Sequence, residues 1–216
     1  MNTAPIVVAV VAEKGGVGKT TLSLTLAVAA VQAGRKVAVL DTDPQSTASK
    51  WTDRRDADMP WVVPTHAARL GAAIEQARVQ GVDFIVIDTP PHSSADATEA
   101  ARRADLVLAP VEPHLFTLET LPKPADLLKI AGTAPALVVV NKASVQGTEA
   151  RDAIEHVKAL YLRAAHRHAG NVGKVAAEHE PRGKAAIEAL QLYEYTVNQI
   201  TRNREHAETQ PTRARA

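Results

Sequence analysis

A glycine-rich segment close to the N-terminus constrains the fold of this chain more than any other feature. The run Lys14-Gly-Gly-Val-Gly-Lys-Thr-Thr21 follows an apolar, β-branched stretch, Ile6–Ala12, that is typical of a buried parallel strand. The next segment, Thr20–Gly34, has the apolar spacing of a helix that ends at Gly34. Backbone N–H groups and a helix N-terminus can face an anion in such a loop, so the sequence predicts a phosphate site.

The residue types in this loop match the needs of a nucleotide. Lys19 can neutralise the β- and γ-phosphates, and the Thr20 hydroxyl can hold Mg²⁺. The residues expected to bind the nucleotide are Gly15, Gly16, Val17, Gly18, Lys19, Thr20 and Thr21. The alternative is a glycine-rich turn with two exposed lysines.

Carboxylates follow two further apolar strands, Lys36–Asp41 and Asp83–Asp88. Carboxylates at the carboxyl ends of parallel strands lie in the crevice where ligands of such sheets bind. One can support the Mg²⁺ shell and another can orient a water for in-line attack. We expect Asp88 to support Mg²⁺. For Asp41-Thr-Asp-Pro-Gln45 the alternative is a polar turn with Asp43 or Ser46 as a helix cap.

Strands and helices alternate along most of the chain, which predicts an α/β fold with a doubly wound, mostly parallel sheet and helices on both faces. Further strands are expected at Asp105–Pro110 and Ala136–Asn141. Helices are expected at Gln45–Ala57, Ala67–Gln80, Ser93–Arg103, Leu118–Ala131, Gly147–Ala169 and Pro181–Ile200. Residues 1–200 are expected to form one domain, and 201–216 a polar, flexible tail.

Composition excludes several classes of protein. The chain has no cysteine, so it has no disulfides, thiolate metal sites or cysteine-ligated iron–sulfur clusters. Its net charge is +1, so any nucleic-acid footprint has to be local. The N-terminus lacks the pattern of a signal peptide, and no apolar run approaches the length of a membrane span.

The glycine-rich run also departs from the common phosphate-loop pattern. Glu13 stands where that pattern has glycine, and a second lysine, Lys14, precedes the double glycine. In this respect the loop resembles the deviant Walker A motif of the ParA/MinD superfamily, and the small ParF-like partition ATPases within it. The resemblance implies ATP and Mg²⁺ as cofactors and a homodimer that encloses two ATP molecules. It also implies that Lys14 reaches the nucleotide of the other subunit, and that Lys14, Lys19 and Asp43 are the catalytic residues.

Other motifs extend the resemblance to about residue 142. Asp41-Thr-Asp-Pro-Gln45 is similar to the family's Asp-x-Asp-Pro-Gln motif, which implies that Asp43 positions the attacking water and that Asp41 assists the metal. Thr89-Pro-Pro, after Asp88, resembles the switch that senses the γ-phosphate. Asn141 matches a residue whose amide reads the adenine edge; the alternative is a simple turn former.

The region after residue 142 departs from the family. Relatives place a short strand and a proline-containing loop there, whereas Ala150–His168 has neither proline nor glycine and predicts one helix. We therefore expect an adenine pocket that is either trimmed or closed by other residues.

The resemblance implies an ATPase with weak intrinsic activity. Its ATP-bound dimer would bind DNA non-specifically and position plasmid or chromosomal DNA or another large cargo. A ParB-like centromere-binding protein or a cargo adaptor would stimulate hydrolysis, in the cytoplasm and on the nucleoid. The cations that could contact DNA, if they are not a solvated face, are Arg163, Arg167, Lys174, Arg182, Lys184, Arg202 and Arg204.

Two other functions compete with this interpretation. An ATP-dependent biosynthetic enzyme of the same fold is the main alternative, although no additional catalytic cluster is visible in the sequence. A MinD-like membrane switch needs an amphipathic C-terminal helix with a bulky apolar face. No Leu, Phe, Val or Trp follows Ile200, so we expect no membrane partner.

Overall fold

The computed structural model describes residues 4–112, 134–143, 158–161 and 164–209. The strands are β1 (Ile6–Val10), β2 (Val37–Asp41), β3 (Trp61–Pro64), β4 (Phe84–Asp88), β5 (Leu106–Val111), β6 (Ala136–Ala143) and β7 (Lys158–Tyr161). The helices are α1 (Lys19–Gln32), α2 (Thr47–Thr52), the 3-10 turn η1 (Ala67–Arg69), α3 (Leu70–Val79), α4 (Ser94–Arg103), α8 (Ala164–Gly170), α9 (Ala176–His179) and α10 (Lys184–Thr209).

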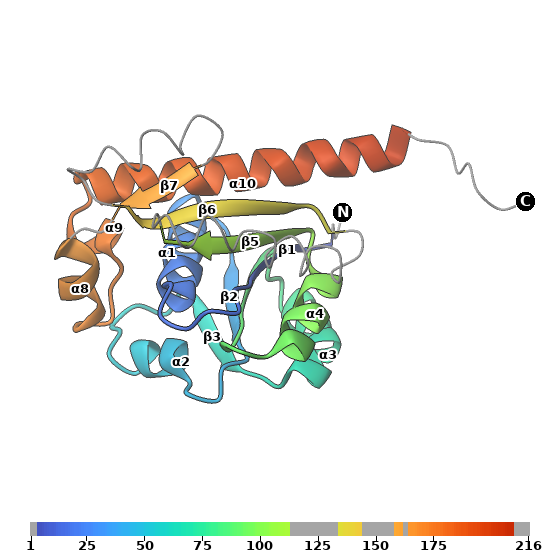
Figure 1. Cartoon of the computed structure of the whole chain (residues 1–216), viewed down its shortest axis with the longest axis horizontal. Coiled ribbons are helices and arrows are strands. Elements are labelled where there is room, and N and C mark those ends of the chain that lie inside the picture. The colour runs from blue at the N-terminus through green and yellow to red at the C-terminus, as the bar shows by residue number, and fades with distance from the viewer. Residues whose placement is uncertain (1–3, 113–133, 144–157, 162–163, 210–216) are drawn as a thin grey trace, which may run out of the picture.

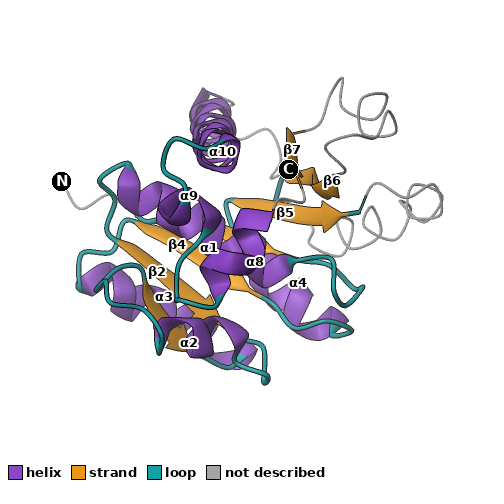
Figure 2. Ribbon diagram, turned by 90° about the vertical axis from the view of Figure 1, so that its left-hand side faces the viewer, coloured by secondary structure: helices purple, strands orange, loops and turns teal. Residues whose placement is uncertain are grey.

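The described strands form one parallel sheet in the order β3-β2-β4-β1-β5-β6-β7. Helices α1, α9 and α10 cover one face of this sheet, and α3 and α4 cover the other (Figures 1 and 2). The predicted α/β fold is therefore confirmed. Among the described residues, no helix is both long and apolar enough to cross a bilayer.

Alternation along the strands builds a separate core on each face of the sheet. In β1, Ile6, Val8 and Val10 pack with α1 and α10 on one face. Val7 and Ala9 pack with α3 and α4 on the other. Because both faces are covered, strands such as β1 and β4 are apolar throughout.

Parallel pairing brings the carboxyl ends of the central strands to one edge of the sheet. In the register of the pairs, Asp88 lies beside both Val10 and Asp41. The loop after β1 therefore starts next to the two carboxylates that end β4 and β2. This edge, which faces the viewer in Figure 2, is where the candidate site lies.

The prediction of a single helix over Gly147–Ala169 was wrong. Lys158–Tyr161 forms β7, which pairs in parallel with β6, and only Ala164–Gly170 is helical among the described residues of that segment. Helix-favouring residues made the segment read as a helix, but β7 supplies hydrogen bonds to the backbone edge of β6. The short strand expected of relatives is therefore present.

Helix α10 extends beyond its predicted end at Ile200, and the expected tail is helical as far as Thr209. Ile200 is buried, and one turn later Arg204 binds both carboxylate oxygens of Asp105 and the carbonyl of Pro5. These contacts hold the last turns against the sheet. The strand β3 was not predicted, and the predicted helix Leu118–Ala131 lies outside the described residues.

A largely buried ion pair joins the segment after α2 to helix α9. The guanidinium of Arg55 binds both carboxylate oxygens of Glu178, at 2.9 Å and 2.6 Å, and its side chain is only 4% exposed. It also donates to the carbonyls of Met59 and Gly173 and lies over the ring of Trp51. The indole of Trp51 in turn donates to the carbonyl of Lys174.

We expect Arg55→Ala to lower the free energy of unfolding by about 3 kcal/mol, because among the described residues it leaves the mostly buried Glu178 carboxylate with only the N–H of Val175 and removes the donor to the carbonyls of Met59 and Gly173. Chemical denaturation monitored by circular dichroism measures this change. Glu99→Gln, which removes an exposed ion pair with Arg103, is the matched control and should cost less than about 0.5 kcal/mol. Equal losses of stability in the two variants would contradict a stabilising role for the ion pair between Arg55 and Glu178.

Candidate functional site

The loop between β1 and α1 has a conformation suited to binding an anion. Gly16 and Gly18 adopt φ of 78° and 87°, in the left-handed region that favours glycine. Among the described residues, no side chain caps the N-terminus of α1, which begins at Lys19. Its first N–H groups therefore remain available to an anion.

The two lysines of this loop have opposite environments. Lys14 is exposed, whereas Lys19 is 7% exposed and donates to the carbonyl of Lys14 at 3.2 Å. Burial lowers the pKa of the Lys19 ammonium, while the carboxylates of Asp88 and Asp43 act in the opposite direction. Lys19 is thus placed inside the site, and Lys14 faces outward.

Asp88 is the most deeply buried charged group of the site, with no exposed surface. Its Oδ1 accepts a hydrogen bond from Ser23 at 2.9 Å, and its Oδ2 has no hydrogen-bond partner among the described residues. Burial, with a smaller contribution from the nearby Asp41, raises the pKa of Asp88 to about 7. The hydroxyls of Thr20 and Ser23 and the ammonium of Lys19 oppose this rise.

Asp41 and Asp43 organise the loop after β2. Asp41 accepts hydrogen bonds from the N–H of Asp43, at 3.2 Å, and from the N–H and hydroxyl of Ser49, at 3.1 Å and 3.0 Å. Asp43 is half-buried, and its Oδ1 accepts from the N–H of Gln45 at 2.9 Å. Asp43 is also close enough to Lys19 to affect its pKa.

These groups fit a magnesium ion bound together with a nucleotide. Mg²⁺ prefers oxygen ligands and is usually held by one or two carboxylates together with waters and substrate phosphates. The hydroxyl of Thr20 and the unpaired Oδ2 of Asp88 supply such oxygens, whereas Asp41 is already bonded to Ser49. Among the described residues, no group of three or more His, Cys, Asp or Glu side chains could hold a metal alone.

Asn141 lies against the loop. Its amide donates to the carbonyl of Val17 at 2.8 Å and to that of Gly18 at 3.5 Å, and the side chain is buried. A Cβ at position 18 would collide with this amide, so only glycine fits there. The amide thus holds the loop, and a role in reading adenine stays a prediction.

Several residues that complete the site were not predicted as site residues. Ser23 binds Asp88, and Ser49 binds Asp41. Lys142 donates to the carbonyl of Gly16 and to Glu112. Ser23 could have been found from its position three residues after Thr20, on the same side of a helix. Lys142 and Gly16 are far apart in the chain, so no local sequence pattern around either residue could predict their contact.

We expect the nucleotide-free protein to lose stability relative to Asp88→Asn as pH rises from 5 to 7. Asp88 has a pKa of about 7 when folded and an ordinary value of 3.8, so in this window only the folded state retains its proton. The contribution is present at low pH and is lost as pH rises through 7, at up to about 1.4 kcal/mol per pH unit. Urea unfolding at a series of pH values measures it, and parallel curves for the two proteins would refute it.

Comparison with known proteins places this geometry in a family. The model of the CobQ/CobB/MinD/ParA nucleotide binding domain matches residues 8–181. The maintenance of carboxysome distribution protein A of Gloeobacter kilaueensis is 37% identical over 122 residues, which cover 56% of this chain and 55% of that protein. The sporulation initiation inhibitor protein Soj of Bacillus subtilis is 27% identical over 155 residues, 53% of this chain and 61% of that protein. The chain therefore matches only a little over half of these relatives.

Solved structures agree with the fold. MinD of Pyrococcus horikoshii, complexed with Mg-ADP, has a TM-score of 0.70 and 21% identity, and the match covers 89% of this chain and 96% of that one. McdA of Cyanothece, complexed with ATP, has a TM-score of 0.65 and 17% identity, with 91% and 97% covered. Given the family match over most of its length, the chain belongs to the CobQ/CobB/MinD/ParA family of nucleotide-binding domains.

Proposed function

We propose that this protein is an ATP- and Mg²⁺-dependent switch of the ParA kind, which dimerises on ATP and positions DNA or another large cargo. The observation that carries the proposal is the opposite placement of two lysines in one phosphate loop. Lys19 is buried beside Asp88 and Asp43, where a bound nucleotide would place its phosphates. Lys14 is exposed at the same edge, where a second subunit could be reached.

The site supports slow hydrolysis. In this proposal Lys19 and the N–H groups of the loop bind the β- and γ-phosphates, and Thr20 and Asp88 hold Mg²⁺. Asp43 orients the attacking water with the carboxylate oxygen that does not bind Gln45. Asp43 is only half-buried and its loop lies open, so the geometry favours a weak intrinsic rate that a partner raises by closing the site.

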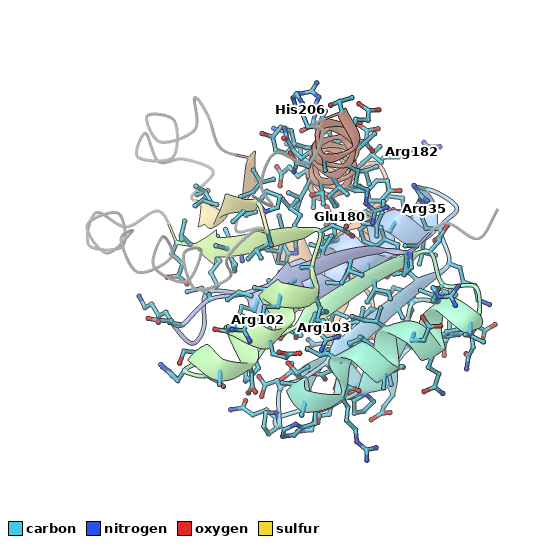
Figure 3. The ribbon with its side chains drawn as sticks, turned by 90° about the vertical axis from the view of Figure 1, so that its right-hand side faces the viewer. Arg35, Arg102, Arg103, Glu180, Arg182 and His206 are labelled. Atoms are coloured by element: carbon cyan, nitrogen blue, oxygen red, sulfur yellow. The ribbon has the colours of Figure 1, made fainter. Side chains whose placement is uncertain are left out.

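DNA contact is assigned to the exposed cations Arg182 and Lys184, at the start of α10, and Lys174, which precedes α9. Arg202 is also exposed, five turns of α10 after Lys184 and about 27 Å away on the same side of the helix. Figure 3 shows Arg182 projecting from the α10 side of the molecule, apart from Arg102 and Arg103 at the end of α4. Arg204 is instead occupied by Asp105. Arg163 lies outside the described residues, and no DNA role is assigned to Arg167.

The cargo and its adaptor follow from the relatives. The relatives include a chromosome partitioning protein and a carboxysome distribution protein, which favours positioning of a large object over synthesis of a product. A ParB-like adaptor bound to the cargo would stimulate hydrolysis, and the protein would act in the cytoplasm on the nucleoid. The biosynthetic alternative keeps some support, because the family model also covers CobQ and CobB proteins.

We expect Lys14→Gln to weaken ATP-dependent dimerisation strongly while ATP binding persists. A two-fold dimer would lose two symmetric contacts of about 1.5 kcal/mol each, which weakens it by about a hundredfold. Sedimentation velocity with a slowly hydrolysed ATP analogue measures the dimer, and titration calorimetry measures nucleotide binding. Lys19→Gln is the comparison, because it should abolish both. A dimer of wild-type strength in Lys14→Gln would remove the role of Lys14 across the interface.

We expect the wild type to bind a random-sequence DNA duplex with ATP, weakly with ADP and weakly without nucleotide. Because phosphate contacts release counterions, binding should weaken steeply between low and moderate salt. Fluorescence anisotropy measures it. The double variant Arg182→Ala/Lys184→Ala should reduce affinity, whereas Arg78→Ala, on the opposite face and paired with Glu75, should not. Absence of binding in every state would favour the biosynthetic alternative or a cargo other than DNA.

A further inference from the structure

Lys142 reaches the phosphate loop from β6, which lies two strands from β1 in the sheet. It lies near the end of β6, directly after Asn141. Its ammonium donates to the carbonyl of Gly16 and, at 2.8 Å, to Oε1 of Glu112. Glu112 directly follows β5, the strand that pairs with β6. A charged side chain with two partners thus bridges the ends of two strands and the centre of the loop.

The backbone of Lys142 is held in an unfavourable conformation. Its φ is 58°, in the left-handed region that residues other than glycine rarely adopt. Ser46 and His92 share this conformation, and they lie in the loops that follow β2 and β4 at the same edge. Such conformations persist where surrounding contacts fix them, and they gather at functional sites. At Lys142 the strain accompanies a side chain directed to Gly16.

Planarity of the peptide unit gives this contact a consequence for phosphate binding. The carbonyl of Gly16 and the N–H of Val17 belong to one trans peptide, so the two groups point in opposite directions. Holding the carbonyl outward therefore turns the N–H of Val17 inward, toward the place of the phosphates. Asn141 has the same effect through the carbonyl of Val17, which belongs to the peptide of the Gly18 N–H.

We propose that Lys142, held by Glu112, is a positioning residue that fixes the Gly16–Val17 peptide so that its N–H faces the phosphates before nucleotide arrives. The ammonium contributes in a second way, because it adds positive potential beside the loop. Its contact is with the loop and needs no γ-phosphate, so it favours ADP and ATP alike. The inference rests on the proposed function for the identity of the ligand. The contact of Lys142 with the Gly16 carbonyl, here called the anchor, is already present in the nucleotide-free protein.

The test compares Lys142→Met, Lys142→Arg, Lys142→Gly and Glu112→Gln with the wild type. Hydrogen exchange of residues 14–20 is measured without nucleotide, and dissociation constants are measured for ADP and ATP by calorimetry. Lys142→Met should speed exchange in the loop and raise both dissociation constants by about tenfold, the effect of losing a charge-assisted hydrogen bond. Lys142→Arg should keep loop exchange and both dissociation constants close to those of the wild type. Glu112→Gln should change both quantities in the same direction as Lys142→Met, but by less.

Two variants separate anchoring from general destabilisation. Lys142→Gly relieves the positive φ but lacks the ammonium, so its loop should exchange as fast as that of Lys142→Met. Lys36→Met is the matched control. The ammonium of Lys36 also donates to a backbone carbonyl, that of Gln80, but at the opposite edge of the sheet. It should leave loop exchange and both dissociation constants unchanged.

The outcomes distinguish the two proposals. Wild-type exchange and wild-type affinities in Lys142→Met, with nucleotide binding lost in Lys19→Met, would overturn the anchor and leave the proposed function intact. Faster loop exchange in Lys142→Met, in a protein whose wild type binds no ATP, would support the anchor and remove the proposed function. An equal effect of Lys36→Met on the loop would also overturn the anchor.

Discussion

A loop that turns its N–H groups toward a ligand must satisfy its carbonyls on the outside, and this constraint organises the whole edge of the sheet. The carbonyls of Gly16, Val17 and Gly18 are held by Lys142 and Asn141 at the end of β6. Lys19 binds the carbonyl of Lys14 from within the loop. The carbonyl of Glu13, just before the loop, accepts the N–H of His92 from the loop after β4. Strands on both sides of β1 therefore fix the loop, and its geometry depends on their register.

The charged groups of the candidate site, Lys19 and Asp88, lack part of their hydrogen-bond and charge partners within the described part of the chain when no ligand is bound. Lys19 and Asp88 are both buried, and burial disfavours the charged form of each. Asp88 gains one hydroxyl partner at Oδ1, while Oδ2 has none among the described residues. A nucleotide phosphate beside Lys19 and a hard cation beside Asp88 would complete both sets of interactions. The site thus gives up some stability in the free protein, and binding recovers it.

The parts of the site that come from one stretch of chain could be predicted from the sequence. Strand, glycines, Lys19 and Thr20 follow one another, and Asp41 and Asp88 end apolar strands that the periodicity reveals. The anchors could not be predicted, since Lys142 meets Gly16 only because β6 lies two strands from β1. The same reason explains β7, where pairing with β6 outweighs a helix-favouring composition, and the last turns of α10, which Arg204 fixes through Asp105.

The loop after β2 extends these connections to the C-terminal helices. Asp41 holds Ser49 in α2, and two residues later the indole of Trp51 donates to the carbonyl of Lys174. Arg55 then donates to the carbonyl of Gly173 and to the carboxylate of Glu178. Glu178 in turn caps the start of α9 by accepting the N–H of Val175. Helix α9 packs against α10 (Figure 2), and the exposed cations Arg182 and Lys184 lie at the start of α10. Asp41 lies beside Asp88. A ligand that changes the charge on either carboxylate therefore affects the hydrogen bonds between Asp41 and Ser49. Hydrogen bonds and packed helices therefore join Asp41, beside the candidate phosphate site, to the helix next to the cations for which we propose contact with DNA.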